Sequence, residues 1–276
     1  MTTLNIIGCG RAAKTLARLW QRQRAIDIGA VLTRSHAGAL DACRFIGGGR
    51  AVARIADMGP ADLWLLGVPD REIEGVARRL AACGSIRPGE GVFHLSGFSS
   101  SALLEPLGAQ GAGVASVHPV LSFAEPDRAV EQFGGSLCGV EGSPDLCVQL
   151  TRLFATIGGN CFPLDAGHKP LYHAGSVFAS NFLVVIMDVA RKAYLAAGVA
   201  PDVAERLLAP LASATLANVI ERGARVSLTG PAARGDHDVV SAQQLAVAKW
   251  SDEAGDAYAA LTALAYRLAA EPLACD

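Results

Sequence analysis

Short apolar runs alternate with segments of helical period along the first part of the chain. Residues 4–7 and 63–68 are almost continuously apolar, as expected of parallel strands that are buried on both faces. Residues 12–23 and 71–83 repeat apolar side chains every three or four positions and are predicted helices. Such alternation predicts a doubly wound α/β sheet of parallel strands. Further strands are predicted at 28–32, 91–95, 113–117, 137–140 and 160–163, with helices at 37–43, 101–107 and 144–157.

The pattern changes after about residue 165. Strand-like runs end, and long segments rich in alanine and leucine follow at 170–197, 201–222, 239–249 and 252–270. Alanine and leucine are strong helix formers, so this half is predicted to be all-α. We therefore predict two domains, residues 1–165 and residues 166–276.

Composition narrows the class of protein. Of the 276 residues 51% are hydrophobic and 18% are charged, and the net charge is -2. A chain of this kind buries a large core, and without a basic excess we expect neither nucleic acid nor a membrane surface as its partner. The seven cysteines form no C-x-x-C pair, which favours reduced thiols over disulfides or a metal site. The apolar stretch 177–189 is too short to span a bilayer, and a strand near residue 3 leaves no room for a signal peptide, so we expect a soluble cytoplasmic protein.

A glycine turn follows the first predicted strand. Gly8, Gly10 and Ala13 form a G-x-G-x-x-A pattern between that strand and a helix. In this context the glycines allow a tight turn and a close approach of backbone to a pyrophosphate, which the helix N-terminus then stabilises. The sequence therefore predicts a dinucleotide-binding Rossmann domain. Arg11, beside Ala12 in the turn, could lie over the adenine or add positive charge.

The end of the second strand bears on the choice of dinucleotide. NAD-binding domains usually place an acidic residue there, whereas this chain has Thr33, Arg34 and Ser35. A guanidinium and two hydroxyls suit the 2′-phosphate of NADP. The alternative is that Arg34 is a solvated loop cation.

Polar residues also follow three later strands, at the edge where such sheets bind ligands. Val68, Pro69 and Asp70 follow one strand. Ser96 and Gly97 follow the next, and His118 ends a third. We expect these residues to face the ligand crevice, with Val68, Pro69, Asp70, Ser96 and Gly97 at the cofactor, although Asp70 could cap a helix, Ser96 could be a turn residue, and His118 could simply be packed.

The segment that opens the second half carries the second group of candidates. Lys169 and His173 lie four residues apart and would share a helix face with Ser176 and Ser180. Near a nicotinamide they could protonate the atom that gains charge during hydride transfer. Pro170 could instead make Lys169 a capping residue. Asn181 lies off this stripe and could contact a ligand or a neighbouring helix.

Several of these motifs resemble a known family. Lys169-x-x-Tyr172-His173, Ser180-Asn181 and residues 228–236 (LTGPAARGD) resemble the Rossmann-like proteins with a C-terminal DUF2520 domain, within the 6-phosphogluconate-dehydrogenase-like superfamily. The resemblance implies a nicotinamide-dependent oxidoreductase and a homodimer formed by the helical domain. His173 replaces the asparagine that often follows the superfamily's lysine, and His118-Pro119 resembles a His-Pro pair of prephenate dehydrogenases.

We therefore expect an NADP-dependent oxidoreductase that acts on a small molecule between its domains. NAD or a deazaflavin is the less favoured cofactor, and a non-catalytic NADP-binding sensor or scaffold dimer is the alternative function. Arg234 could bind a substrate carboxylate, or it could pair with Asp236. The candidate catalytic residues are Lys169, His173, His118 and Asn181, and the candidate substrate-binding residues are Ser176, Ser180 and Arg234.

Overall fold

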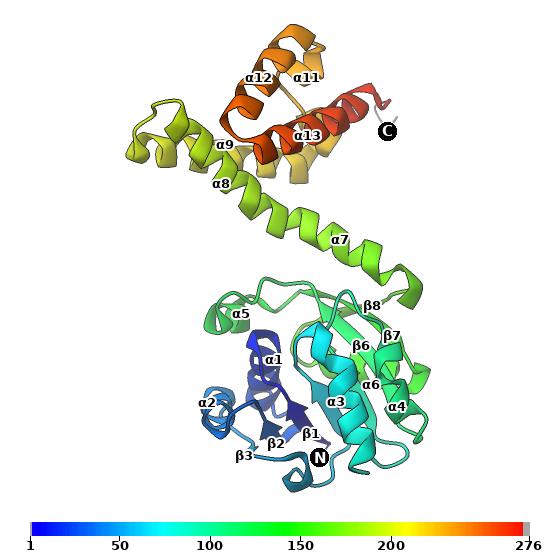
Figure 1. Ribbon diagram of the computed structural model, residues 1–276. Helices are drawn as coiled ribbons and strands as arrows, with labels where there is room; N and C mark the ends of the chain where they lie inside the picture. Colours follow the sequence, from blue (N-terminus) through cyan, green and yellow to red (C-terminus); the bar gives the residue numbers. More distant parts are fainter. Residues whose placement is uncertain (1, 273–276) are drawn as a thin grey trace. The chain divides into compact units, whose positions relative to one another are not determined.

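The chain forms two compact units, Met1–Ser180 and Asn181–Asp276. The computed structural model describes residues 2–272 (Figure 1). The division lies later than the predicted boundary at 165, because the helix α7 (Lys169–Ala179) is anchored in the first unit by the fully buried side chain of Lys169. Of the seven cysteines, the six among the described residues are free thiols, and Cys275 lies outside them.

The first unit is built on one eight-stranded sheet with the order β3-β2-β1-β4-β5-β6-β7-β8. All neighbouring strands are parallel except β6 and β7. The strands are β1 (Thr3–Ile7), β2 (Asp27–Leu32), β3 (Arg50–Val52), β4 (Leu63–Leu66), β5 (Gly91–His94), β6 (Gly113–Pro119), β7 (Leu137–Gly142) and β8 (Asn160–Pro163).

The antiparallel ladder between β6 and β7 differs from the all-parallel prediction. Pro119 at the end of β6 pairs with Cys138 near the start of β7. The chain therefore turns back at this edge of the sheet, and β7 runs antiparallel to β6. The helix α5 (Pro126–Gln132) lies in this return and was not predicted from the sequence. Apolar runs do not encode strand direction, which depends on where the connection passes.

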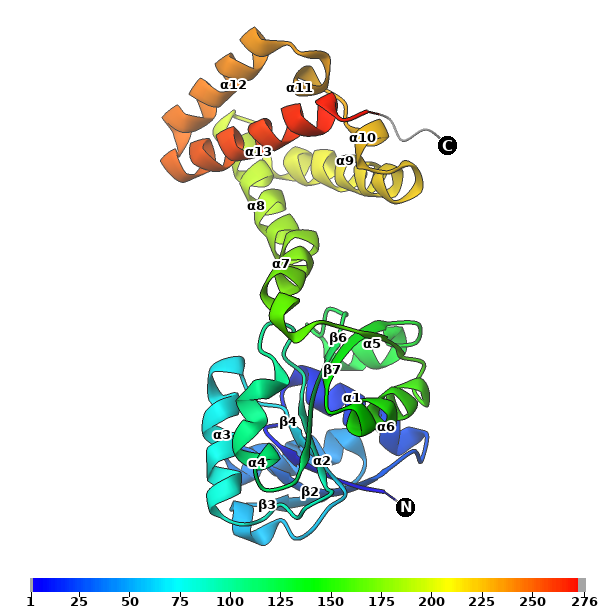
Figure 2. The same cartoon turned by 90° about the vertical axis from the view of Figure 1, so that its right-hand side faces the viewer.

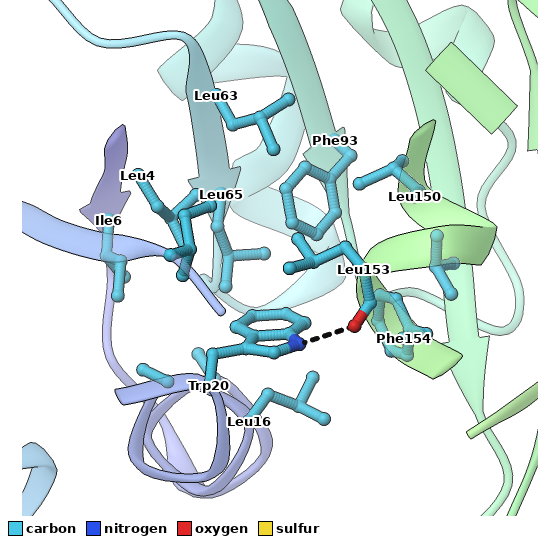
Figure 3. Packing of buried hydrophobic residues seen from close by; sticks show 14 of the residues in the cluster. Leu4, Ile6, Leu16, Trp20, Leu63, Leu65, Phe93, Leu150, Leu153 and Phe154 are labelled. Atoms are coloured by element: carbon cyan, nitrogen blue, oxygen red, sulfur yellow. Dashed lines mark hydrogen bonds between the residues drawn. The ribbon is translucent and has the colours of Figure 1, made fainter. Parts of the chain in front are cut away.

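Helices cover both faces of the sheet (Figures 1 and 2). Trp20 and Phe154 pack edge to face with ring centroids 5.2 Å apart in the core below one face, and the Trp20 indole donates to the carbonyl of Leu153 (Figure 3). Trp64 and Leu80 lie in the core of the other face. The helices of this unit are α1 (Arg11–Arg22), α2 (His36–Ile46), η1 (Ile55–Asp57), α3 (Asp70–Ala82), η2 (Ser101–Leu104), α4 (Glu105–Gly108), α5, α6 (Pro144–Ala155), η3 (Ala166–His168) and α7.

The second unit is helical, as predicted. Its elements are α8 (Asn181–Ala196), α9 (Pro201–Arg222), α10 (Ala224–Ser227), α11 (Pro231–Arg234), α12 (His237–Trp250) and α13 (Asp252–Ala270). The single helix predicted at 170–197 is interrupted at Ser180, whose φ and ψ are −127° and −69°.

Large apolar side chains are exposed over the second unit. Ile220 is 77% exposed and Leu245 is 73% exposed. By length and composition alone, Ala166–Ala196 and Pro201–Arg222 are long and apolar enough to cross a membrane. The first of these is longer than the 177–189 stretch considered from the sequence, since its helical turns extend on both sides of that stretch.

Candidate active site

The glycine turn brings the ends of β1 and β4 into close contact. Gly8 has φ of +76°, and its amide donates to the carbonyl of Leu32 at 2.7 Å. A side chain at Gly67 would meet the Cβ of Ala13 at 2.6 Å and the carbonyl oxygen of Gly8. These glycines therefore let α1 begin directly above the junction of the two strands.

A hollow of about 290 Å³ lies over this turn. Gly10 precedes α1 in extended conformation, and no side chain of residues 2–272 caps the amides of the helix N-terminus. Free amides and the helix dipole at such a position suit a pyrophosphate. The hollow is lined by Gly10, Arg11, Ala12, Ala13, Leu66, Gly67, Val68, Pro69, Asp70, Leu95 and Ser96, so it brings together most residues predicted to bind the cofactor.

The segment after β2 forms the start of α2. The hydroxyl of Ser35 accepts from the amide of Gly38 and caps the helix, and the hydroxyl of Thr33 donates to the carbonyl of Ser35 at 2.7 Å. Arg34 is exposed between them. Both hydroxyls thus have local roles in the loop, whereas the side chain of Arg34 is exposed to solvent.

Ser96 joins two strand ends. Its hydroxyl donates to the carboxylate of Asp70 at 2.6 Å and accepts from the amides of Phe98 and Ser99. Asp70 is the first residue of α3 and makes no capping bond, because the cap position is Pro69. The Ser96–Asp70 pair therefore fixes the loop after β5 beside the cofactor hollow.

His94 is a buried residue of this region that the sequence did not single out. Its Nδ1 accepts from the amide of Ser96, and its Nε2 lies 3.1 Å from the carbonyl of Ser100, so the proton lies on Nε2. Burial lowers the pKa of His94 to about 4. The neutral ring thus holds the 96–100 loop against the end of β5.

Lys169 contacts the loop after β5 and the paired residues Ser116 of β6 and Glu141 of β7. Its ammonium donates to the carbonyl of Ser96 at 2.9 Å and the hydroxyl of Ser116 at 2.5 Å, and lies 3.4 Å from the carboxylate of Glu141. Glu141 is itself buried and accepts from the amide and hydroxyl of Ser101. Burial lowers the pKa of Lys169, and Glu141 opposes that shift.

An ammonium has three hydrogens, and here all three have acceptors. This geometry favours a positioning role for Lys169 over the predicted role of proton donor. Ser116 and Glu141 were not identified from the sequence. The available signal was a polar residue inside the predicted strand 113–117 and another directly after the predicted strand 137–140.

Three aromatic side chains meet beside this network. The Tyr172 hydroxyl lies 2.9 Å from Nδ1 of His118, and the rings of His118 and His173 are 5.5 Å apart in an edge-to-face arrangement. Burial, with smaller effects of His173 and Lys169, lowers the pKa of His118 to about 4. The structure therefore brings three of the candidate residues, His118, His173 and Lys169, close together.

Gly97 lies directly under the two imidazoles. A side chain there would meet Nδ1 of His173 at 2.6 Å and Nε2 of His118 at 2.7 Å. The Nδ1 of His173 is buried and has no hydrogen-bond partner among residues 2–272. Only glycine leaves room for both rings at this strand end.

The remaining candidates are Ser176, Ser180, Asn181 and Arg234. The Ser180 hydroxyl donates to the carbonyl of Ser176 within the helix. Arg234 donates to the carboxylate of Asp236 at 2.9 Å, which is the pairing considered as its alternative role. Asn181 and Arg234 belong to the second unit. In the part of the chain that the structure describes, no group of three His, Cys, Asp or Glu residues could hold a metal ion.

Comparisons with known proteins agree with this architecture. Residues 2–119 match the model of a Rossmann-like domain, and residues 136–265 match the model of DUF2520, a domain of unknown function. The chain belongs to the Rossmann-like proteins with a C-terminal DUF2520 domain. The family resemblance seen in the sequence is thereby confirmed, and the DUF2520 match begins within the first unit of this Rossmann-like protein.

Solved structures share the fold of this Rossmann-like DUF2520 protein. Protein TM1727 from Thermotoga maritima is 27% identical, with 96% of this chain and 98% of that chain covered and a TM-score of 0.74. BF3122 from Bacteroides fragilis, described as a candidate NADP oxidoreductase, is 20% identical with coverages of 96% and 98% and a TM-score of 0.77. A reductive aminase from Aspergillus terreus, solved with NADPH, is 19% identical with coverages of 97% and 93% and a TM-score of 0.66. No curated protein matches the sequence.

Proposed function

We propose that this protein is an NADP-dependent oxidoreductase that transfers hydride between the nicotinamide and a small substrate. One observation carries the proposal. A hollow lies over a dinucleotide-type glycine turn. At Ser96 this hollow adjoins a buried cluster of ionisable side chains on the neighbouring strands. Enzymes concentrate such perturbed groups at their active sites. The oxidoreductase descriptions of the structural neighbours add support.

The residues present fit a dinucleotide. The uncapped N-terminus of α1 suits the pyrophosphate, and the exposed Arg34 guanidinium suits a 2′-phosphate. When bound, NADP supplies or accepts the hydride through its nicotinamide ring. NAD and a deazaflavin remain the other candidate cofactors, and the choice of NADP depends on Arg34 and on the absence of an acidic residue from residues 33–35.

On the substrate side, His118 and His173 are proposed to contact the reacting group. Lys169 acts through the Ser96 carbonyl that it holds, and it adds positive charge beneath the strand ends. Asn181, Ser176, Ser180 and Arg234 remain proposed contributors to the substrate site.

The test has a binding arm and a turnover arm. We expect tighter binding of NADPH than of NADH by fluorescence titration, and Arg34→Glu should weaken NADPH binding by about 10-fold to 100-fold while leaving NADH nearly unaffected. The matched control is Arg44→Ala, which removes an exposed arginine that lies within α2. Equal affinities for the two dinucleotides, unchanged by Arg34→Glu, would contradict the assignment of NADP.

Turnover distinguishes the enzyme from a sensor or scaffold dimer. NADPH oxidation is measured with aldehydes, ketones, oxo acids and cyclic imines. Oxidation with any of them supports the enzyme. Tight NADPH binding without oxidation favours the sensor, a function that the exposed apolar helices of the second unit would serve as a partner surface.

A further inference from the structure

Tyr172 holds one nitrogen of His118. The Tyr172 hydroxyl lies 2.9 Å from Nδ1 of His118, and it reaches this position across Gly139, where an added side chain would lie 3.2 Å from the hydroxyl oxygen. His118 and Gly139 are register partners on β6 and β7, so the contact is built into the ladder.

The direction of this hydrogen bond follows from the donors available. Burial raises the pKa of Tyr172, so its hydroxyl keeps its proton. Among the described residues, His118 Nδ1 is the one hydrogen-bond partner of that hydroxyl. A phenol O–H is a stronger hydrogen-bond donor than the N–H of a neutral imidazole, and an imidazole nitrogen is a stronger acceptor than a phenol oxygen, so Tyr172 donates and Nδ1 accepts.

The other nitrogen of His118 then carries the proton. Nε2 lies over Gly97, within 2.7 Å of the point that a side chain would occupy, and next to the ring of His173. The titratable groups around His118 are Lys169 and His173 from α7, which disfavour a second proton, and Asp70 from α3, which opposes them. His118 is therefore a neutral ring that offers one N–H.

We propose that Tyr172 fixes His118 as the Nε2–H tautomer, and that the site thereby selects a substrate with an uncharged oxygen acceptor. That substrate is an aldehyde, ketone or oxo acid, or the alcohol in the reverse direction. An iminium ion has no lone pair on nitrogen and cannot accept this hydrogen bond. The substrate class rests on the proposed oxidoreductase function, whereas the tautomer does not.

In the proposed reduction of a carbonyl group, His118 keeps its proton throughout. The carbonyl carbon accepts the hydride from NADPH, and the C=O π electrons move to the oxygen. Nε2–H stabilises the developing alkoxide by its hydrogen bond. The alkoxide takes a proton from water, which leaves the alcohol, a hydroxide ion and NADP⁺. Tyr172 is thus a positioning residue that acts through His118.

The first experiment reads the tautomer directly. In a ¹⁵N-edited NMR spectrum of the full-length protein at pH 7, assigned with His118→Gln, we expect neutral His118 with its proton on Nε2. Tyr172→Phe should change the His118 Nδ1 resonance, whereas Tyr258→Phe, which removes a hydroxyl bonded to Gln243 in the second unit, should not. A proton on Nδ1, or an imidazolium at pH 7, would overturn the proposal.

The second experiment reads the substrate class. We expect NADPH oxidation with carbonyl compounds and at least about 10-fold slower oxidation with preformed cyclic iminium ions, together with a loss of kcat of about 10-fold in Tyr172→Phe at unchanged NADPH affinity. Faster reduction of iminium ions would overturn the selection of an oxygen acceptor and leave the oxidoreductase function standing. Binding of NADPH with no oxidation of either class would overturn both the function and the selection.

Discussion

At the residue scale, the site depends on a buried ion pair. Lys169 and Glu141 are almost completely buried, and each is also hydrogen-bonded to serine groups, Lys169 to Ser96 and Ser116 and Glu141 to Ser101. Removing one partner from such a pair leaves an uncompensated buried charge, which is far more costly than losing the pair as a whole. The pair thus makes the positions of Ser96, Ser116 and Ser101 depend on each other.

We predict that Lys169→Met and Glu141→Leu each lower the free energy of unfolding by about 3–5 kcal/mol, and that the double variant recovers part of this loss. Urea denaturation measures it. Lys192→Met, which removes an exposed pair with Asp188, is the control and should change stability by less than about 1 kcal/mol. Single variants as stable as the wild type would show that neither charge is buried in the folded protein.

Two buried histidines make stability depend on pH. The pKa values of His94 and His118 are about 4 in the fold, against 6.5 for an unperturbed histidine, chiefly because of burial. Between pH 6.5 and pH 4 the unfolded chain takes up protons that the folded chain does not. The free energy of unfolding therefore falls as the pH is lowered through this range.

The loss amounts to about 2 kcal/mol for each histidine between pH 6.5 and pH 5. Denaturation at a series of pH values measures the slope of the free energy of unfolding against pH. His94→Asn should reduce this slope by the contribution of about one bound proton. His36→Asn, at an exposed position on α2, is the control and should keep the wild-type slope. An unchanged slope in His94→Asn would mean that His94 is protonated in the folded protein.

At the element scale, the cofactor hollow depends on how closely β4 approaches α1. Gly67, just after β4, has no space for a side chain, since Ala13 of α1 and the Gly8 carbonyl occupy the position. The distance between strand end and helix N-terminus is thus set by glycine and alanine at facing positions.

We predict that Gly67→Ala separates these elements, lowers stability by about 1–3 kcal/mol and weakens NADPH binding at least about 10-fold. Gly75→Ala in the interior of α3 is a matched control, because an added methyl group there meets nothing within 4 Å. That variant should be as stable as the wild type or more stable by about 0.5–1 kcal/mol. Wild-type NADPH affinity in Gly67→Ala would contradict the assignment of the hollow.

At the scale of the whole molecule, the second unit exposes more apolar surface than a soluble monomer normally does. Its buried apolar side chains within one chain are few, whereas Val184, Leu216 and Ile220 are each at least half exposed. Large exposed apolar patches mark protein–protein or membrane contacts. We propose a second copy of the chain as the partner, in line with the dimer that the family resemblance implies.

Sedimentation analysis tests the dimer. We expect a homodimer at micromolar concentration, and Ile220→Lys with Leu245→Lys should shift it toward monomer. Val148→Lys, at an exposed apolar position of α6 in the first unit, is the control and should leave the dimer intact. A monomeric wild type, or sedimentation of the protein with lipid vesicles, would contradict the proposal.

Much of the fold was predictable because its signals are local. The alternation of apolar runs with helical periods predicted the strands and helices of the first unit, and the change after residue 165 predicted the helical half. β3 is only three residues long and carries too short a pattern to detect. The direction of β7 and the point where the compact units divide depend on packing between elements distant in sequence.

The sequence by itself determined the glycine turn, the absence of an acidic residue after β2, and the candidate residues at the strand ends, because each is a pattern of neighbours in the chain. Only the tertiary structure decided what those residues do. Lys169 meets Glu141, and Tyr172 meets His118, because β6 and β7 pair side by side and α7 packs against them. The number of acceptors around an ammonium and the proton position on an imidazole are properties of such contacts, so no spacing of residues could have specified them.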